Sequence, residues 1–129
     1  GADTMTTIAT VLKTRTAYLA AAKTLDDTKE RLWDQHYGDI AADDDGDYSE
    51  RQPAYQADVD AADLGALVKR RNDLRDEMVA AFLNATDHPR EMRLLMPKLR
   101  SADKMGGKVR DDLIKLITTA SPANLRGGR

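Results

Sequence analysis

A long stretch without glycine or proline is the feature that most limits how this chain can fold. Residues 5–37 contain neither residue, and their apolar side chains recur every three or four positions. This period predicts one amphipathic α-helix over 6–37, with Gly38 as a left-handed stop. Such a helix is about 48 Å long, because each residue adds about 1.5 Å. It must therefore pack against another long element or a second chain.

A second long helix is predicted over 53–84, with Pro53 at its first position. If it folds back on 6–37 as a long antiparallel, coiled-coil-like hairpin, an apolar seam forms between the two. On the first helix the predicted seam residues are Leu12, Leu19, Leu25 and Trp33, and Leu19 faces Leu74. Four apolar side chains fall beside the seam: Val11, Leu32, Val79 and Leu83. They would stay exposed unless the C-terminal helices or another copy of the chain cover them, and we expect an oligomer, most simply a dimer.

The segment 38–52 between the two helices has no helical period and is predicted to be an acidic loop, extended by repulsion among its aspartates. Asp43, Asp45 and Asp47 partly match the ligand spacing of an EF-hand calcium loop. Ala41 and Gln52 stand where that loop needs its two end ligands, so no metal site is expected.

The remaining chain is shorter and more broken. Residues 86–120 are predicted to form two or three short helices, because Pro97 interrupts one apolar segment and glycines precede the other. Residues 121–129 are expected to be a flexible basic tail, and residues 1–5 a disordered N-terminus or an added remnant. No segment alternates apolar and polar residues over the length of a strand, so the expected fold class is all-α.

The charge is divided unevenly along the chain. Residues 1–63 carry 6 basic and 14 acidic side chains, whereas residues 64–129 carry 14 basic and 8 acidic ones. The chain has no cysteine, which excludes disulfides, thiolate zinc sites and a cysteine nucleophile. We therefore expect a reducing, cytoplasmic location. No apolar run is long enough for a membrane span, and no membrane partner is expected.

The function expected first is that of a non-catalytic interaction protein: a small adaptor, assembly factor or inhibitor that presents an acidic surface to a basic protein partner. No known family is recognised in the sequence. Its serines lack a nucleophile-elbow motif, and no phosphate-binding glycine loop occurs, so neither an enzyme nor a cofactor is expected. The predicted partner-binding residues are Asp39, Asp43, Asp44, Asp45, Asp47 and Glu50.

Two other classes of function stay open. The basic C-terminal third is compatible with a nucleic-acid-associated regulator that binds phosphate groups. Its candidate contact residues are Arg100, Lys104, Lys108, Arg110 and Lys115. Acid–base catalysis by the many carboxylates is the third class, although no motif points to it.

Overall fold

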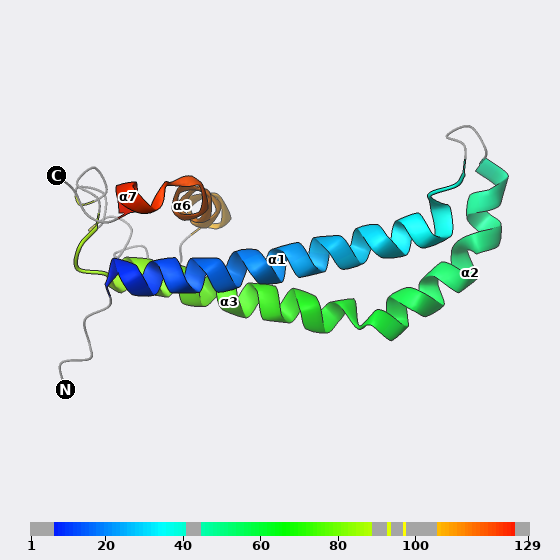
Figure 1. Ribbon diagram of the computed structural model, residues 1–129, viewed down its shortest axis with the longest axis horizontal. Coiled ribbons are helices and arrows are strands. Elements are labelled where there is room, and N and C mark those ends of the chain that lie inside the picture. Colours follow the sequence, from blue (N-terminus) through cyan, green and yellow to red (C-terminus); the bar gives the residue numbers. More distant parts are fainter. Residues whose placement is uncertain (1–6, 41–44, 89–92, 94–96, 98–105, 126–129) are drawn as a thin grey trace. The chain divides into compact units, whose positions relative to one another are not determined.

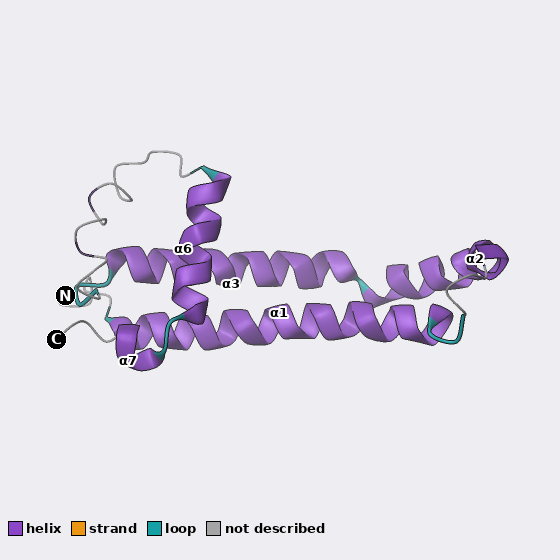
Figure 2. Ribbon diagram, turned by 90° about the horizontal axis from the view of Figure 1, so that it is seen from above, coloured by secondary structure: helices purple, strands orange, loops and turns teal. Residues whose placement is uncertain are grey.

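The computed structural model describes residues 7–40, 45–88, 93, 97 and 106–125, and the regular elements in this part of the chain are helices (Figure 1). They are α1 (Ile8–Tyr37), α2 (Asp45–Ala62), α3 (Leu64–Asn84), α6 (Gly107–Thr119) and α7 (Pro122–Leu125). No strand occurs among the described residues (Figure 2). The prediction of an all-α chain is therefore confirmed.

The chain divides into two compact units. Unit 1 combines the described residues of Gly1–Leu19 with those of Asn72–Arg129, and unit 2 is the continuous segment Ala20–Arg71. Helices α1 and α3 each contribute one part to each unit, and α2 belongs entirely to unit 2.

Unit 1 is organised around an apolar core where the start of α1, the end of α3 and α6 meet. Figure 2 shows α6 crossing the parts of α1 and α3 that belong to this unit. Val11, Phe82 and Ile117 are completely buried, and burial of each such side chain stabilises the fold by about 1.5–3 kcal/mol. The core residues are Ile8, Val11, Met78, Val79, Ala81, Phe82, Ala85, Leu113, Ile117 and Leu125.

Polar bonds close the helix ends of unit 1. The guanidinium of Arg15 donates from Nη1 to the backbone carbonyls of Ile117 (3.0 Å) and Ala120 (2.7 Å), at the end of α6. At the start of α1, the backbone N–H of Ile8 donates to Oδ1 of Asp87 at 3.0 Å. Helix ends leave unpaired N–H and C=O groups, so these bonds satisfy groups that would otherwise lack a partner.

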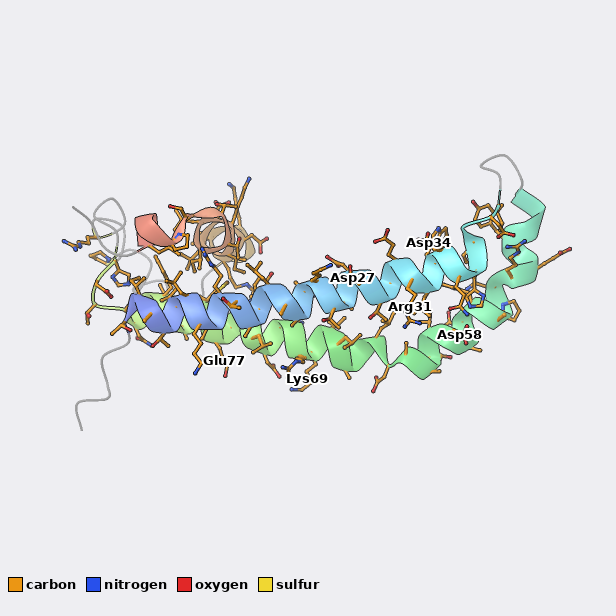
Figure 3. The ribbon with its side chains drawn as sticks, viewed as in Figure 1. Asp27, Arg31, Asp34, Asp58, Lys69 and Glu77 are labelled. Carbon is orange, nitrogen blue, oxygen red and sulfur yellow. The ribbon has the colours of Figure 1, made fainter. Side chains whose placement is uncertain are left out.

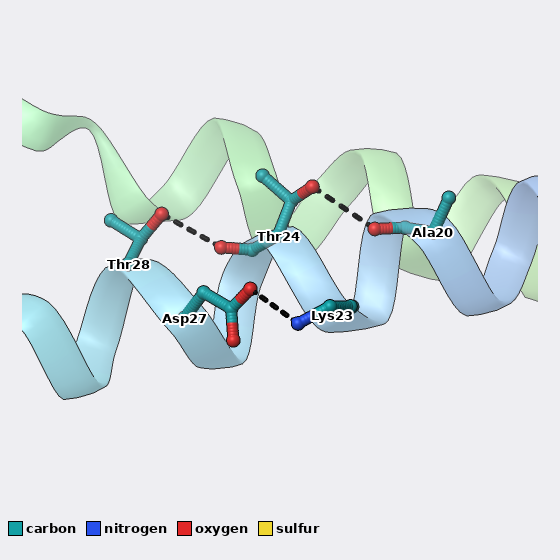
Figure 4. Close-up of polar contacts among 5 residues, drawn as sticks. All are labelled: Ala20, Lys23, Thr24, Asp27 and Thr28. Atoms are coloured by element: carbon teal, nitrogen blue, oxygen red, sulfur yellow. Dashed lines mark hydrogen bonds and ion pairs between the residues drawn. The ribbon is translucent and has the colours of Figure 1, made fainter.

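In unit 2, α1 contains two threonines, and their hydroxyls bond to the helix itself. Thr24 donates from Oγ1 to the carbonyl of Ala20 at 3.0 Å, and Thr28 donates to that of Thr24 at 2.7 Å (Figure 4). Lys23 forms an ion pair with Asp27 one turn later, at 2.8 Å. Because these hydroxyls pair locally, threonine is accommodated inside the helix.

The acidic loop predicted over 38–52 is shorter than expected, because α2 already begins at Asp45. Pro53 therefore lies inside α2 and not at a helix start. An internal proline destabilises a helix by about 3 kcal/mol. The sequence pattern alone therefore predicts that the helix begins at Pro53 and does not continue through it.

Contacts with the end of α1 account for the extra helical turns of α2. The hydroxyl of Tyr37 donates to Oε1 of Gln52 at 2.9 Å, and its ring stacks on Tyr48 with the ring centroids 5.2 Å apart. These contacts lie on the residues just before Pro53. Tertiary packing of this kind supplies most of the stability of helices in proteins, and here it offsets the cost of the proline.

The single helix predicted over 53–84 is divided at Asp63. This residue has φ 51°, a left-handed conformation that aspartate tolerates better than most residues other than glycine. The carbonyl of Asp63 accepts a hydrogen bond from the N–H of Ala66 at 3.1 Å, and its Oδ1 lies 3.4 Å from the same nitrogen. Asp63 therefore ends α2 and caps the start of α3.

The predicted seam of α1 is buried only in part: Leu25 is fully buried as predicted, but two other members are exposed. Leu19 is 43% exposed and Trp33 is 47% exposed, whereas a neighbouring row with a spacing of seven residues is covered. That row consists of Val11, Tyr18, Leu25 and Leu32. The row through Leu19 contains Asp26, so only the other row is apolar throughout, and the continuously apolar row is buried. Val79 of α3 is likewise buried, contrary to its predicted place beside the seam.

Gly38 follows α1 as expected, but for a different reason. Its φ is not in the left-handed range, and its N–H donates to the carbonyl of Asp34 at 2.9 Å. A Cβ atom at this position would lie 2.6 Å from the same carbonyl oxygen. Glycine is therefore needed here because the backbone passes too close for a side chain.

Among the predicted C-terminal elements, α6 matches the expected final helix. The other segment expected in 86–120, around Pro97, falls largely outside the described residues. The tail predicted over 121–129 begins instead with α7, whose Leu125 is fully buried in the core of unit 1. Two features explain why this part of the tail is helical: Leu125 is buried, and Pro122 is favourable at the first position of a helix. The composition of the tail alone does not predict this helix.

Candidate functional site

The end of α1 and the helix α2 carry most of the aromatic residues of the chain. The only tryptophan and three of the four tyrosines lie here, in unit 2. We call them the aromatic cluster: Trp33, Tyr37, Tyr48 and Tyr55.

Tyr37 is the centre of the aromatic cluster and is only 4% exposed. Its ring centroid lies 4.4 Å from that of Trp33, 5.2 Å from that of Tyr48 and 5.1 Å from that of Tyr55. Trp33 meets Tyr55 edge-on, with centroids 5.9 Å apart and an interplanar angle of 86°. These separations fall in the favourable range for aromatic pairs, so the rings form one packed group.

Polar contacts also join α1 to α2 beside these rings. The imidazole of His36 donates from Nε2 to Oδ2 of Asp58 at 2.6 Å, and its ring meets Tyr55 edge-on at 5.8 Å. The hydroxyl of Tyr37 donates to Gln52, as described above. Together these bonds fix the positions of the rings, so the aromatic cluster is preorganised.

Trp33 is the member of the aromatic cluster that reaches solvent, with 47% of its surface exposed. A large apolar side chain at this exposure, held by the buried Tyr37 and the half-buried Tyr48 and Tyr55, resembles the aromatic anchors found at the centres of protein interfaces. The aromatic cluster therefore offers a rigid, partly exposed ring for contact with another molecule.

The charge around the aromatic cluster is strongly negative. Residues 33–63 contain ten acidic side chains and one basic side chain, Arg51. The Nη1 group of Arg51 donates to the side chain of Asp39 and, at 2.9 Å, to the carbonyl of His36. The hydrogen bond from Arg51 holds the pKa of Asp39 below its ordinary value, and a backbone hydrogen bond of Asp39 lowers it further. The one cation of this segment is thus engaged with unit 2 itself.

Acidic side chains also line the exposed surface of α1 in unit 2. Asp26, Glu30 and Asp34 are exposed and follow one another at intervals of four residues, and we call them the acid row. Figure 3 marks Asp34 and Asp27 on this part of α1, and Asp58 on α2. Trp33 lies within the acid row, three residues after Glu30 and directly before Asp34.

The structure places the acidic residues predicted to bind a partner in different settings. Asp39 and Glu50 are exposed in unit 2, and Asp45 and Asp47 belong to the first turn of α2. Asp43 and Asp44 lie outside the described residues. Only part of the predicted acidic site is thus described. Its described residues lie within two positions of Tyr37 or three positions of Tyr48 in the sequence.

The basic residues proposed for nucleic acid lie in unit 1. Lys108, Arg110 and Lys115 are exposed on α6, whereas Arg100 and Lys104 lie outside the described residues. Lys108 is 3.6 Å from Asp112, one turn along the same helix. This carboxylate lies between the two lysines on the helix surface and weakens the positive field there.

The aromatic cluster is not among the sites predicted from the sequence. Its signal was present: Trp33 and Tyr37 are four residues apart, and Tyr48 and Tyr55 are seven apart, which are helical spacings. The second pair fell in a segment interpreted as a loop and the start of a new helix, so its common face was not considered.

Metal-binding groups and membrane-spanning helices are both absent from the described part of the chain. It contains no group of three or more histidine, aspartate and glutamate side chains placed to hold a metal ion. In the same residues, no helix has both the length and the apolar character needed to cross a membrane.

The fold and the site define an all-α protein with a preorganised aromatic cluster in an acidic surrounding. Comparisons with protein-family models, with curated proteins and with solved structures find no match.

Proposed function

We propose that this protein is a non-catalytic helical interaction protein: a small adaptor, assembly factor or inhibitor whose unit 2 presents an acidic surface to a basic protein partner. One observation carries the proposal: a rigid aromatic cluster with an exposed tryptophan lies in a segment with ten acidic residues and one basic residue. Binding surfaces commonly combine an aromatic anchor with a charged border that sets the partner.

The distribution of charge supports a basic partner. Arg51 is held by Asp39 and by the carbonyl of His36, so the carboxylates around it set the sign of the local field. Glu50 and Asp60 are exposed on α2. A surface with charge of one sign raises the rate of encounter with an oppositely charged partner and disfavours partners of like charge.

Salt-dependent binding tests the proposal. The protein is titrated with a lysine-rich and an arginine-rich peptide at low and at physiological ionic strength. We expect binding of both, weaker at the higher ionic strength, because exposed charges are screened beyond about 8 Å there. Absence of binding even at low ionic strength would overturn the proposal.

A matched pair of triple variants assigns the binding to unit 2. Asp34→Asn, Glu50→Gln and Asp60→Asn together should weaken binding of both peptides. The control, Asp76→Asn with Asp111→Asn and Asp112→Asn, removes the same number of charges from unit 1 and should leave binding nearly unchanged. Equal losses in the two triple variants would mean that the peptides sense only net charge.

The alternative function is a nucleic-acid-associated regulator that uses the basic C-terminal third. The exposure of Lys108, Arg110 and Lys115 on α6 favours it, and the proximity of Asp112 to Lys108 counts against it. Retention on random double-stranded DNA at low salt, lost on charge reversal at Lys108 and Lys115, would support this function. No retention of the unmodified protein would remove it.

We also propose that residues 6–85 form a long antiparallel helical hairpin, that two copies associate as a homodimer, and that the protein works in the cytoplasm. The exposed apolar side chains Leu19 and Val109, each 43% exposed, are compatible with a further contact. Light scattering tests the dimer, which predicts a mass above that of one chain. A mass equal to one chain at micromolar concentration would rule the dimer out.

A further inference from the structure

We propose that the exposed part of Trp33, together with the acid row, binds arginine side chains of an extended basic segment in the partner. This inference rests on the proposed function, because it specifies the chemistry that the acidic surface recognises.

The indole of Trp33 is positioned to receive a cation. The ring of Tyr37 lies 4.4 Å from it and that of Tyr55 meets it edge-on, which fixes the indole while 47% of the residue stays exposed. A cation over an indole face, within about 6 Å of the ring centre, is attracted by the electrons of the ring. Tryptophan is the best side chain for this interaction, and here it is held in place before binding.

The acid row supplies charges at a regular spacing beside this ring. Asp26, Glu30 and Asp34 are each one helical turn apart, which separates them by about 6 Å along α1. In an extended peptide, side chains at alternate positions lie on one side and are about 7 Å apart. Basic residues at every second position of such a peptide would therefore meet successive members of the acid row.

Three cations of α1 lie near this surface: Lys23, Lys29 and Arg31, and Arg31 is exposed three residues before Asp34, on the side of the acid row. Lys23 is already paired with Asp27 at 2.8 Å. Lys29 lies four residues before Trp33, on the opposite side of the indole from Asp34, and repels a bound cation there. The peptide is thus directed to the side of the indole that carries Glu30 and Asp34, where its cations compete with Arg31 for Asp34.

Arginine fits this arrangement better than lysine. A guanidinium is planar, so it stacks on an indole while its N–H groups bond to a carboxylate alongside. Arginine is also less strongly hydrated than the ammonium of lysine, which lowers the cost of contact with an aromatic ring. The predicted ligand is therefore a segment in which arginine alternates with small residues.

Two peptides of equal length and charge test the preference, one alternating arginine with serine and the other lysine with serine. Affinities are measured by calorimetry. Because Trp33 is the only tryptophan of the chain, its fluorescence reports contact directly. We expect the arginine peptide to bind about two- to fivefold more tightly for each stacked side chain, and to change the Trp33 emission.

Variants at the indole separate stacking from general attraction. Trp33→Leu keeps an apolar side chain and should abolish the preference for arginine while both peptides still bind. Trp33→Phe preserves ring packing against Tyr37 and should give an intermediate preference, and circular dichroism verifies that both variants remain helical. The control Leu19→Ala trims an equally exposed apolar residue of α1 and should leave the preference intact.

The outcomes distinguish this inference from the proposed function. Equal affinity of the two peptides for the unmodified protein, or a preference that survives Trp33→Leu, overturns the arginine inference but leaves the acidic surface in place. If neither peptide binds in a salt-dependent manner, the proposed function itself is wrong.

Discussion

The imidazole of His36 lies 2.6 Å from the carboxylate of Asp58 and joins the last turn of α1 to the second half of α2. The side chain of His36 is 14% exposed and that of Asp58 is 44% exposed, so the pair lies at the border of the aromatic cluster. The pair connects the two helices that carry the aromatic rings. Substitution of either residue therefore tests whether this connection stabilises the fold.

A double-mutant cycle measures the pairing of His36 with Asp58. We expect His36→Gln and Asp58→Asn each to lower the free energy of unfolding, with a coupling of about 0.5–1 kcal/mol between them. Urea denaturation of the four proteins gives this value. Additive losses would show that the two side chains do not interact in solution.

The pKa of Asp39 should depend on Arg51. In the folded protein this pKa is lowered, so the pair stabilises the fold above the ordinary pKa of aspartate and loses that effect as the pH falls through the lowered value. Arg51→Met should raise the pKa toward the ordinary value, as followed by NMR of the carboxyl carbon. Arg70→Met, a charge removal elsewhere in unit 2, is the control that should not move it.

Gly38→Ala should destabilise the protein by about 1–3 kcal/mol, because the new Cβ would lie 2.6 Å from the carbonyl oxygen of Asp34. Gly107→Ala is the matched control. No atom lies within 4 Å of a Cβ at that position, and alanine favours the helix, so its effect should be neutral or stabilising by up to about 1 kcal/mol. Thermal melts compare the two, and equal effects would contradict the close approach at Gly38.

Loss of the Arg15 side chain should loosen the attachment of α6. Arg15→Met removes the two hydrogen bonds to the carbonyls of Ile117 and Ala120, and we expect a loss of about 1.5–3 kcal/mol in the free energy of unfolding. Lys13→Met, a change of an exposed cation on the same helix, should cost little. Hydrogen exchange adds a local test, in which the amides of α6 lose protection only in the Arg15 variant.

Two of the leucines of α1, Leu25 and Leu19, should respond very differently to the same change. Leu25 is fully buried, so Leu25→Asp would bury a charge and should cost more than about 3 kcal/mol or unfold the protein. Leu19 is 43% exposed, and Leu19→Asp should alter stability by less than about 1 kcal/mol. Strong destabilisation by Leu19→Asp would restore the seam predicted from the sequence.

Much of the helical structure could be predicted from the sequence. The bounds of α1 followed from the absence of glycine and proline over 5–37, and those of α6 from the pattern between Gly107 and Pro122. Both signals are local. A helix that lacks breakers and has an apolar stripe needs little further information to be recognised.

The parts that were not predicted depend on contacts between residues distant in sequence, or on uncommon backbone conformations. The first turns of α2 follow from the packing of Tyr48 and Gln52 on Tyr37, which helical propensity does not register. The break at Asp63 uses an aspartate where glycine is the usual signal. The apolar pattern places Trp33 in a buried seam. In the structure Trp33 is exposed, because the neighbouring row that contains Leu25 and Leu32 is the buried one.

The division of the chain into units has a consequence for the order in which the protein folds. Unit 2 is one continuous segment, so all of its contacts join residues made close together during synthesis. In unit 1, the start of α1 packs against α6 and Leu125, which are synthesised about a hundred residues later. Because contacts between distant residues form slowly, we expect the aromatic end to assemble first, while the chain is still emerging from the ribosome. Until α6 and α7 have been synthesised, Val11 and Phe82 are not fully buried. We therefore expect a chain truncated before α6 to be the form most prone to aggregate.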